Sequence, residues 1–175
     1  MFLDLHELIE VPGRSAEFAC ELDEQRLAFP ALLRFLSPVK ASGLVKNEAG
    51  MLLLEGSIET DMLLCCDLCA AEYEQHMTLP VRATLQADAP DDDEDDTLFP
   101  LEGDGIDVSS VMETSFILQT DMRFLCRPDC RGLCPSCGKN LNDGPCDCAE
   151  EVDPRLAVLG QLLDDTQKKE EQSEV

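Results

Sequence analysis

Apolar and polar residues alternate along two stretches in the first half of the chain. The first stretch covers residues 51–64 and the second covers residues 79–87. Alternation of period two is typical of strands that bury one face and expose the other. The pattern therefore predicts two half-buried antiparallel strands that form a hairpin. The inward-facing residues are expected to be Leu52, Leu54, Gly56, Ile58, Thr60, Met62 and Leu64 on the first strand, and Leu79, Val81, Ala83, Leu85 and Ala87 on the second.

Weaker strand patterns occupy residues 1–9, 16–22 and 38–46. The segment Asn47-Glu48-Ala49-Gly50 has the composition of a turn that leads into the 51–64 strand. Residues 24–36 are ambiguous, because Pro30 splits what would otherwise be a short helix.

Two segments show helical patterns instead. The first lies at about residues 109–120, where Ser110 and Glu113 match a capping box, in which each side chain bonds to the other residue's backbone amide. A second, short helix is predicted to begin at Asp153, a favoured N-cap residue, with Pro154 in the first position. The predicted core-facing residues are Val108, Val111, Met112, Ser115, Leu118 and Met122 on the first helix, and Leu156, Leu159 and Leu163 on the second.

Residues 88–105 contain a solid acidic run at 91–96 and no apolar period, so this segment is predicted to be a flexible loop. The polar residues 164–175 are predicted to be a flexible tail. The expected fold is α+β: an antiparallel sheet, open or barrel-like, with one or two helices and a C-terminal cysteine block stapled by zinc. We predict a mainly β domain at 1–125, followed by the cysteine block and its short helix at 126–163.

Eight of the ten cysteines form closely spaced pairs. Thiolates two or three residues apart reach one metal ion with little loop strain, and four thiolates make a closed tetrahedral zinc site. The spacing therefore predicts two zinc ions per chain. The pairs are Cys66 with Cys69, Cys126 with Cys130, Cys134 with Cys137, and Cys146 with Cys148.

The C-terminal pairs are predicted to form one site. Cys134-Pro135-Ser136-Cys137-Gly138 has the form of a zinc knuckle, because glycine after the second cysteine permits the positive φ that turns backbone amides toward sulfur. Turn-forming residues then lead to the remaining ligands of that site, Cys146 and Cys148.

The other site would join distant parts of the chain. Cys126 and Cys130 can meet Cys66 and Cys69 only if the 109–120 helix returns the chain to the tip of the hairpin. In the alternative, Cys134 and Cys137 pair with Cys66 and Cys69. Cys65 could also replace Cys66, because neighbours on a strand point in opposite directions.

Other uses of these cysteines are weighed against zinc. The chain begins with no secretory signal pattern and has no apolar run of membrane-spanning length, so we expect a cytoplasmic protein with reduced thiols. An iron–sulfur cluster also takes four thiolates and stays the alternative cofactor. The chain contains no phosphate-binding glycine loop, G-x-S-x-G or H-E-x-x-H motif, which counts against an enzyme.

The net charge is extreme, at −24 from 13 basic and 37 acidic residues. Phosphate contacts dominate nucleic-acid affinity, so we expect no DNA partner and little unaided RNA binding. The lack of an apolar run of spanning length predicts no membrane partner. A basic protein partner suits this charge better. Four basic residues nevertheless cluster along the cysteine block and are expected either to contact phosphate or to screen the thiolates: Arg123, Arg127, Arg131 and Lys139.

The order of these motifs resembles the YceD family, the large ribosomal RNA subunit accumulation proteins of bacteria and plastids. The resemblance is carried by Cys66-x2-Cys69, by the run from Cys126 through Cys130-Arg131-Gly132-Leu133-Cys134-Pro135 to Cys137-Gly138, by Asn140-Leu141-Asn142, by Cys146-x-Cys148 and by Asp153-Pro154-Arg155-Leu156.

The resemblance implies a non-enzymatic factor that supports accumulation of large-subunit ribosomal RNA. The family's gene commonly neighbours one for a small, basic zinc-ribbon protein of the large subunit. Our first hypothesis is therefore a factor that binds and shields a basic ribosomal protein. The second is a factor that contacts RNA of the precursor large subunit through the Arg123–Lys139 strip. A thiol- or zinc-dependent enzyme is the third.

Overall fold

The computed structural model describes residues 1–86 and 97–148. The chain forms two compact units, the first covering Met1–Gly132 and the second beginning at Leu133. All helices and strands of the described residues belong to the first unit. In chain order they are β1 (Phe2–Asp4), α1 (His6–Glu10), β2 (Ser15–Glu21), the 3-10 turn η1 (Glu24–Arg26), β3 (Leu32–Phe35), β4 (Lys40–Glu48), β5 (Met51–Cys65), β6 (Glu72–Gln86), β7 (Leu98–Pro100), β8 (Gly105–Asp107) and α2 (Val108–Gln119).

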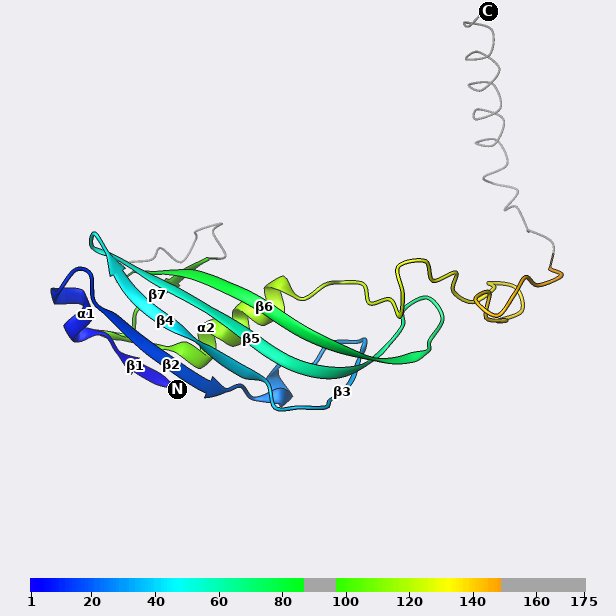
Figure 1. Cartoon of the computed structure of the whole chain (residues 1–175), viewed down its shortest axis with the longest axis horizontal. Helices are drawn as coiled ribbons and strands as arrows, with labels where there is room; N and C mark the ends of the chain where they lie inside the picture. The colour runs from blue at the N-terminus through cyan, green and yellow to red at the C-terminus, as the bar shows by residue number, and fades with distance from the viewer. Residues whose placement is uncertain (87–96, 149–175) are drawn as a thin grey trace, which may run out of the picture. The chain divides into compact units, whose positions relative to one another are not determined.

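The main sheet has the strand order β2-β4-β5-β6-β7, and β3 pairs with the second half of β5. Every pair is antiparallel except β6 with β7. The two 15-residue strands β5 and β6 form a long hairpin that gives the sheet its length (Figure 1). The sheet does not close, so the predicted α+β fold is confirmed in its open form. No helix of the described residues is long and apolar enough to cross a membrane.

One face of the sheet carries the core, and α2 lies along that face (Figure 1). Every second residue of β5 points into it, as the alternation predicted, and Leu54, Met62 and Leu64 are fully buried. Val81, Ala83 and Leu85 continue the core on β6. The two-residue period therefore decides which side of the hairpin receives the helix.

The prediction for α2 was right in position but wrong in two details. The N-cap is Asp107, whose carboxylate accepts a hydrogen bond from Ser109 N at 3.1 Å, and not Ser110. Leu118 is exposed and Met122 lies beyond the end of the helix, also exposed, whereas Phe116 is buried. The apolar stripe was extended one turn too far: the helix ends at Gln119, before Met122, and Leu118 is exposed in its last turn.

Other elements differ from the predicted ones in extent. Residues 1–9 form β1 and the short helix α1 instead of one strand, and 24–36 form η1 and β3. β4 continues to Glu48, so the tight turn is confined to Ala49 and Gly50, both at positive φ. The segment expected to be loop at 88–105 contains β7. Its residues 88–96, the helix expected at Asp153 and the tail lie outside the described residues.

Candidate metal centres

The first cysteine pair lies at the turn between β5 and β6. Cys66 N donates to Ala71 O at 2.9 Å, and Ala70 N donates back to Cys66 O at 2.8 Å. These two bonds close a tight loop that holds Cys66 and Cys69 on the same side. Both cysteines are buried.

The segment that follows α2 brings the second pair to this turn. Asp67 N donates to Phe124 O at 2.9 Å, and Asp67 Oδ2 accepts from Phe124 N at 2.6 Å. The ring of Phe124 also stacks on Phe29, with centroids 4.8 Å apart. Two residues later the chain reaches Cys126. The helix therefore returns the chain to the hairpin tip, as the pairing required.

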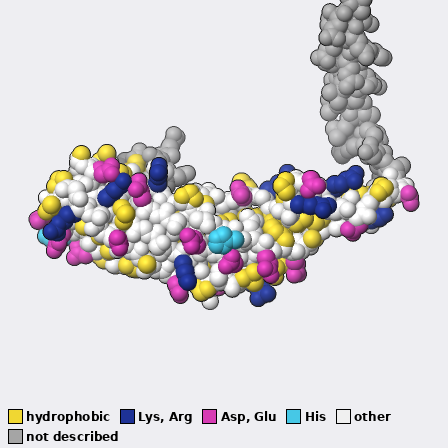
Figure 2. All heavy atoms as spheres, in the orientation of Figure 1, with side chains coloured by type: hydrophobic (Ala, Val, Ile, Leu, Met, Phe, Trp, Pro, Cys, Tyr) yellow, Lys and Arg dark blue, Asp and Glu magenta, His cyan; other side chains and the backbone are white. Residues whose placement is uncertain are grey.

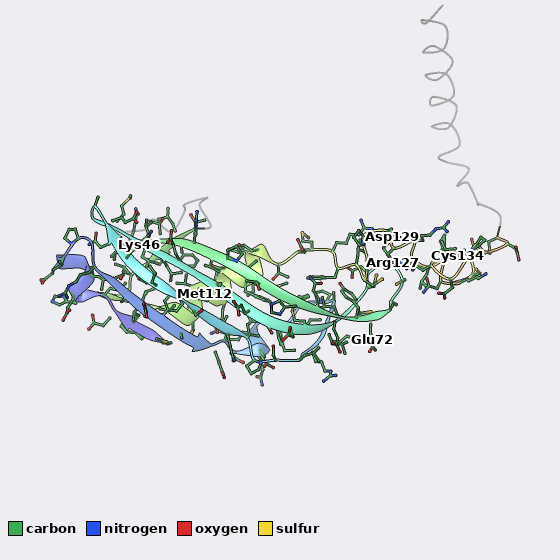
Figure 3. The ribbon with its side chains drawn as sticks, in the orientation of Figure 1. Lys46, Glu72, Met112, Arg127, Asp129 and Cys134 are labelled. Carbon is green, nitrogen blue, oxygen red and sulfur yellow. The ribbon has the colours of Figure 1, made fainter. Side chains whose placement is uncertain are left out.

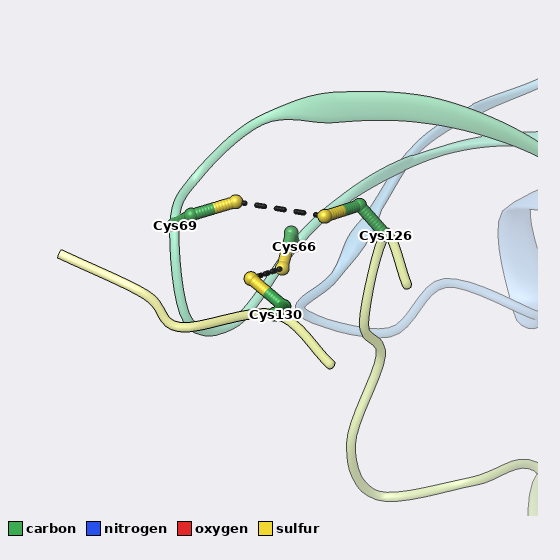
Figure 4. A group of neighbouring side chains, drawn as sticks. All are labelled: Cys66, Cys69, Cys126 and Cys130. Carbon is green, nitrogen blue, oxygen red and sulfur yellow. Dashed lines mark hydrogen bonds between the residues drawn. The ribbon is translucent and has the colours of Figure 1, made fainter. Parts of the chain in front are cut away.

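The four sulfurs of this first cysteine cluster lie within 4.8 Å of one another. Cys66 Sγ is 3.8 Å from Cys130 Sγ, and Cys69 Sγ is 3.7 Å from Cys126 Sγ (Figure 4). All four point into one small volume; Cys66 and Cys69 come from the turn between β5 and β6, and Cys126 and Cys130 from the segment after α2 (Figure 4). The cluster contains Cys66 and not Cys65, which is the last residue of β5 and pairs with Glu72.

The thiols of this first cysteine cluster differ widely in pKa. Burial acts to raise the pKa of Cys66, but hydrogen bonds from the backbone of Cys126, Cys69 and Leu68 outweigh it and lower that pKa to about 6. Burial raises the pKa of Cys126 to about 12, together with its hydrogen bonds to neighbouring thiols. The thiolate form is thus favoured at Cys66 and disfavoured at Cys126, and a bound cation would favour it at both.

The second cysteine cluster belongs to the second unit. The sulfurs of Cys134, Cys137, Cys146 and Cys148 lie within 4.8 Å of one another. Cys134 is buried, whereas Cys137 and Cys148 are exposed. Backbone hydrogen bonds from Cys137 and Ser136 lower the pKa of Cys134 to about 6, and a hydrogen bond with Cys137 and burial raise that of Cys148 to about 12. This cluster repeats the electrostatic pattern of the first.

The two C-x2-C turns also share one backbone arrangement. Cys134 N donates to Lys139 O, and Gly138 N donates back to Cys134 O, both at 2.8 Å. These are the same two bonds, at the same spacing, as in the Cys66 turn. Gly138 has φ +73°, and its counterpart Ala70 has φ +55°. The sequence does not reveal this likeness, because Ala70 occupies the position at which glycine is expected.

Eight of the ten cysteine sulfurs fall into these two clusters of four, each of which could hold a metal ion. The alternative in which Cys134 and Cys137 join Cys66 and Cys69 does not match this grouping. Cys20 belongs to neither cluster and packs partly buried against the core, near Ser109 Oγ at 3.9 Å.

The four basic residues of the cysteine block are all exposed. Arg127 Nε lies 3.5 Å from Asp129 Oδ1, and both residues are labelled in Figure 3. Arg123 and Arg131 belong to the first unit, on either side of this pair in the chain. Lys139 belongs to the second unit, where its Nζ donates to Pro145 O at 2.7 Å. Because all four side chains are exposed, both expected roles, contact with phosphate and screening of the thiolates, stay predictions.

The chain belongs to the YceD family. The family model described as large ribosomal RNA subunit accumulation protein YceD matches residues 54–163, which is more than half of the chain and includes both cysteine clusters. The resemblance inferred from the sequence is therefore confirmed.

Individual relatives support this assignment. The chain is 26% identical to the protein YlbN of Bacillus subtilis (strain 168) over 162 residues, which cover 91% of this chain and 94% of that protein. It is 38% identical over 78 residues to the large ribosomal RNA subunit accumulation protein YCED homolog 1, chloroplastic, of Arabidopsis thaliana, covering 44% of this chain and 24% of the plant protein. The chain thus spans nearly all of the Bacillus relative but about a quarter of the plant relative. No solved structure matches the chain.

Proposed function

We propose that this protein is a non-enzymatic, cytoplasmic ribosome-biogenesis factor that supports accumulation of large-subunit ribosomal RNA by binding a basic ribosomal protein. The observation that carries this proposal is the pair of closed four-sulfur clusters in a chain of the YceD family. A catalytic zinc keeps one position open for water or substrate, whereas four cysteines fill a tetrahedral ion completely. Both clusters are therefore suited to hold the fold together.

Zinc fits the geometry of the clusters. Zinc–sulfur bonds of about 2.3 Å at tetrahedral angles place neighbouring sulfurs about 3.8 Å apart. The two sulfur–sulfur distances in the first cluster are 3.8 and 3.7 Å. Four thiolates and Zn²⁺ leave a net charge of about −2 at each site. Elemental analysis of protein purified under reducing conditions should find about two zinc ions per chain. Iron together with acid-labile sulfide would instead show that the cysteines hold iron–sulfur clusters.

Charge supports the choice of a basic partner. The chain carries −24, and filled zinc sites make it more negative. Figure 2 shows acidic side chains spread over the visible face of the first unit, not gathered in one patch. Such a field attracts a basic protein and repels bare phosphate.

A pull-down with the tagged full chain tests the partner class. The same lysate is divided, and one half is treated with ribonuclease. We expect a basic ribosomal protein to be retained in both halves. If capture of every ribosomal protein is lost after ribonuclease, the protein-binding proposal fails and contact through RNA is favoured.

A further inference from the structure

One edge of β6 has no strand partner over most of its length. β5 covers the other edge from Glu72 to Leu85. On the open side β7 pairs only with Thr84–Gln86. From Glu72 to Arg82, no strand of the described residues pairs with this edge. Figure 3 labels Glu72 at the end of β6 that lies far from β7.

The ladder defines which backbone groups face the open side. Thr84 N donates to Thr97 O, and Gln86 O accepts from Leu101 N, so even-numbered residues direct their N–H and C=O groups away from β5. The β5–β6 register continues without a bulge to Glu72. The same groups of Glu72, Glu74, His76 and Thr78 must therefore point outward. Pro80 has no N–H and interrupts the row before β7.

The two faces of the sheet differ at this edge. On the outer face, Glu72 and Glu74 are exposed. Asp61, across from His76 on β5, adds a third carboxylate, with its Oδ1 2.8 Å from His76 Nδ1. On the inner face, Tyr73 and Met77 are only partly buried, although both pack against the core. The outer face at this edge is therefore acidic, and the inner face carries apolar surface that is incompletely covered.

We propose that the 72–78 edge of β6 binds an extended segment of the basic partner, which adds one strand to the sheet. The segment's backbone would bond to the outward-facing groups, and its alternating side chains would separate by face. Lys or Arg on the outer face would meet Glu72 and Glu74, while apolar residues on the inner face would cover Tyr73 and Met77. This inference rests on the proposed function only in taking the partner to be basic.

The probe for this edge is a short peptide of alternating Val and Lys, added to the zinc-loaded full chain. Amide hydrogen exchange should slow at Glu72, Glu74, His76 and Thr78 when the peptide binds. A peptide of alternating Val and Glu is the matched control and should leave these amides unchanged. Protection elsewhere, or none at these residues, would overturn the proposal. Protection without peptide that grows with protein concentration would assign the edge to a second copy of the chain and overturn it as well.

A proline substitution isolates the contribution of the strand edge. Thr78→Pro removes one outward N–H, and Pro80 shows that β6 accepts proline at such a position. Thr78→Val loses the same hydroxyl but keeps the N–H. We expect Thr78→Pro to bind the Val–Lys peptide about fivefold to tenfold more weakly than Thr78→Val. Equal binding would contradict strand addition.

Charge reversal supplies a second variant on the same edge. Glu72→Lys combined with Glu74→Lys changes exposed side chains only and keeps every backbone donor. It should abolish the preference for the Val–Lys peptide over the Val–Glu peptide. An unchanged preference would overturn the proposed face assignment. If the peptide binds but the pull-down captures no ribosomal protein, the ribosomal partner is rejected and the proposal of strand addition at β6 stands.

Discussion

At the scale of single residues, the two cysteine turns place different residues, Ala70 and Gly138, at the same left-handed position. Both residues have positive φ, at +55° and +73°. The left-handed region costs an alanine roughly 1 kcal/mol or more, because its Cβ approaches the following carbonyl. The Cys66 turn therefore holds a strained residue that the Cys134 turn avoids. The first cysteine cluster, which lies beside Ala70, is the feature that would keep this conformation in place.

We predict that Ala70→Gly stabilises the first unit by about 0.5 kcal/mol, since relief of the left-handed strain exceeds the extra backbone entropy of glycine in the unfolded chain. Gly138→Ala is the mirror control and should destabilise the second unit by about 1 kcal/mol. Tyr73 packs against the first cluster and is the only tyrosine in a chain without tryptophan, so its fluorescence reports urea unfolding there. A loss of stability on Ala70→Gly would contradict the argument.

Asp67 ties the first turn to the segment after α2, because its backbone and its side chain both bond to Phe124. We predict that Asp67→Ala costs about 1–3 kcal/mol, since Phe124 N loses its acceptor close to a buried ring. Asp67→Asn keeps an acceptor and should cost less. Exchange of the Phe124 amide should rise in the alanine variant and much less in the asparagine variant. Equal exchange in the two variants would show that this bond does not hold the segment.

At the scale of elements, the sequence predicted those parts that depend on local periodicity. The alternation from Leu52 to Leu64 identified the buried face of β5, since a two-residue period leaves one choice of face. The cysteine spacing likewise predicted the second cluster, whose four residues are close together in the chain. The first cluster required the further inference that the 109–120 helix returns the chain to the hairpin tip.

The failures arise where tertiary contacts outweigh local signals. The N-cap is Asp107 because β8 ends there and places its carboxylate beside Ser109. β6 begins at Glu72, earlier than predicted, because pairing with β5 stabilises a polar-rich stretch that has weak strand character alone. The local sequence does not predict that residues 66–71 and 134–139 share one turn, because alanine rarely adopts the positive φ that Ala70 has.

The two clusters should unfold independently when a ligand is lost. Cys134→Ala removes one sulfur of the second cluster, where a bound metal would supply folding free energy. We expect it to abolish amide protection around that cluster and to leave the sheet unchanged. Cys66→Ala should instead raise exchange at Asp67 and Phe124, where the hairpin tip meets the segment after α2. Cys65→Ala, which alters a neighbour outside the cluster, is the control. Identical exchange patterns in the first two variants would refute the grouping.

At the scale of the whole molecule, charge distinguishes the two partner classes. The chain carries −24, but residues 123–140 contain four basic residues and one acid, Asp129. A protein partner would respond to the overall field. RNA would have to bind at the basic strip, while the rest of the acidic chain repels its phosphates. The same change in charge should therefore have opposite effects on the two kinds of binding.

Deleting residues 91–96 removes six negative charges and provides that change. If a basic protein binds, the deletion should lower the association rate, and added salt should lower it further, because screening acts within about 8–10 Å at physiological ionic strength. A same-length replacement by Ser and Gly controls for the loss of chain length.

If RNA binds instead, the deletion should tighten RNA binding. The double variant Arg127→Ala with Arg131→Ala should then weaken RNA binding and flatten its salt dependence. Association rates measured with a basic ribosomal zinc-ribbon protein and with bare large-subunit RNA decide between them. We expect slower protein association and no effect of the arginine variants on it; tighter RNA binding with unchanged protein association would reject the shielding role.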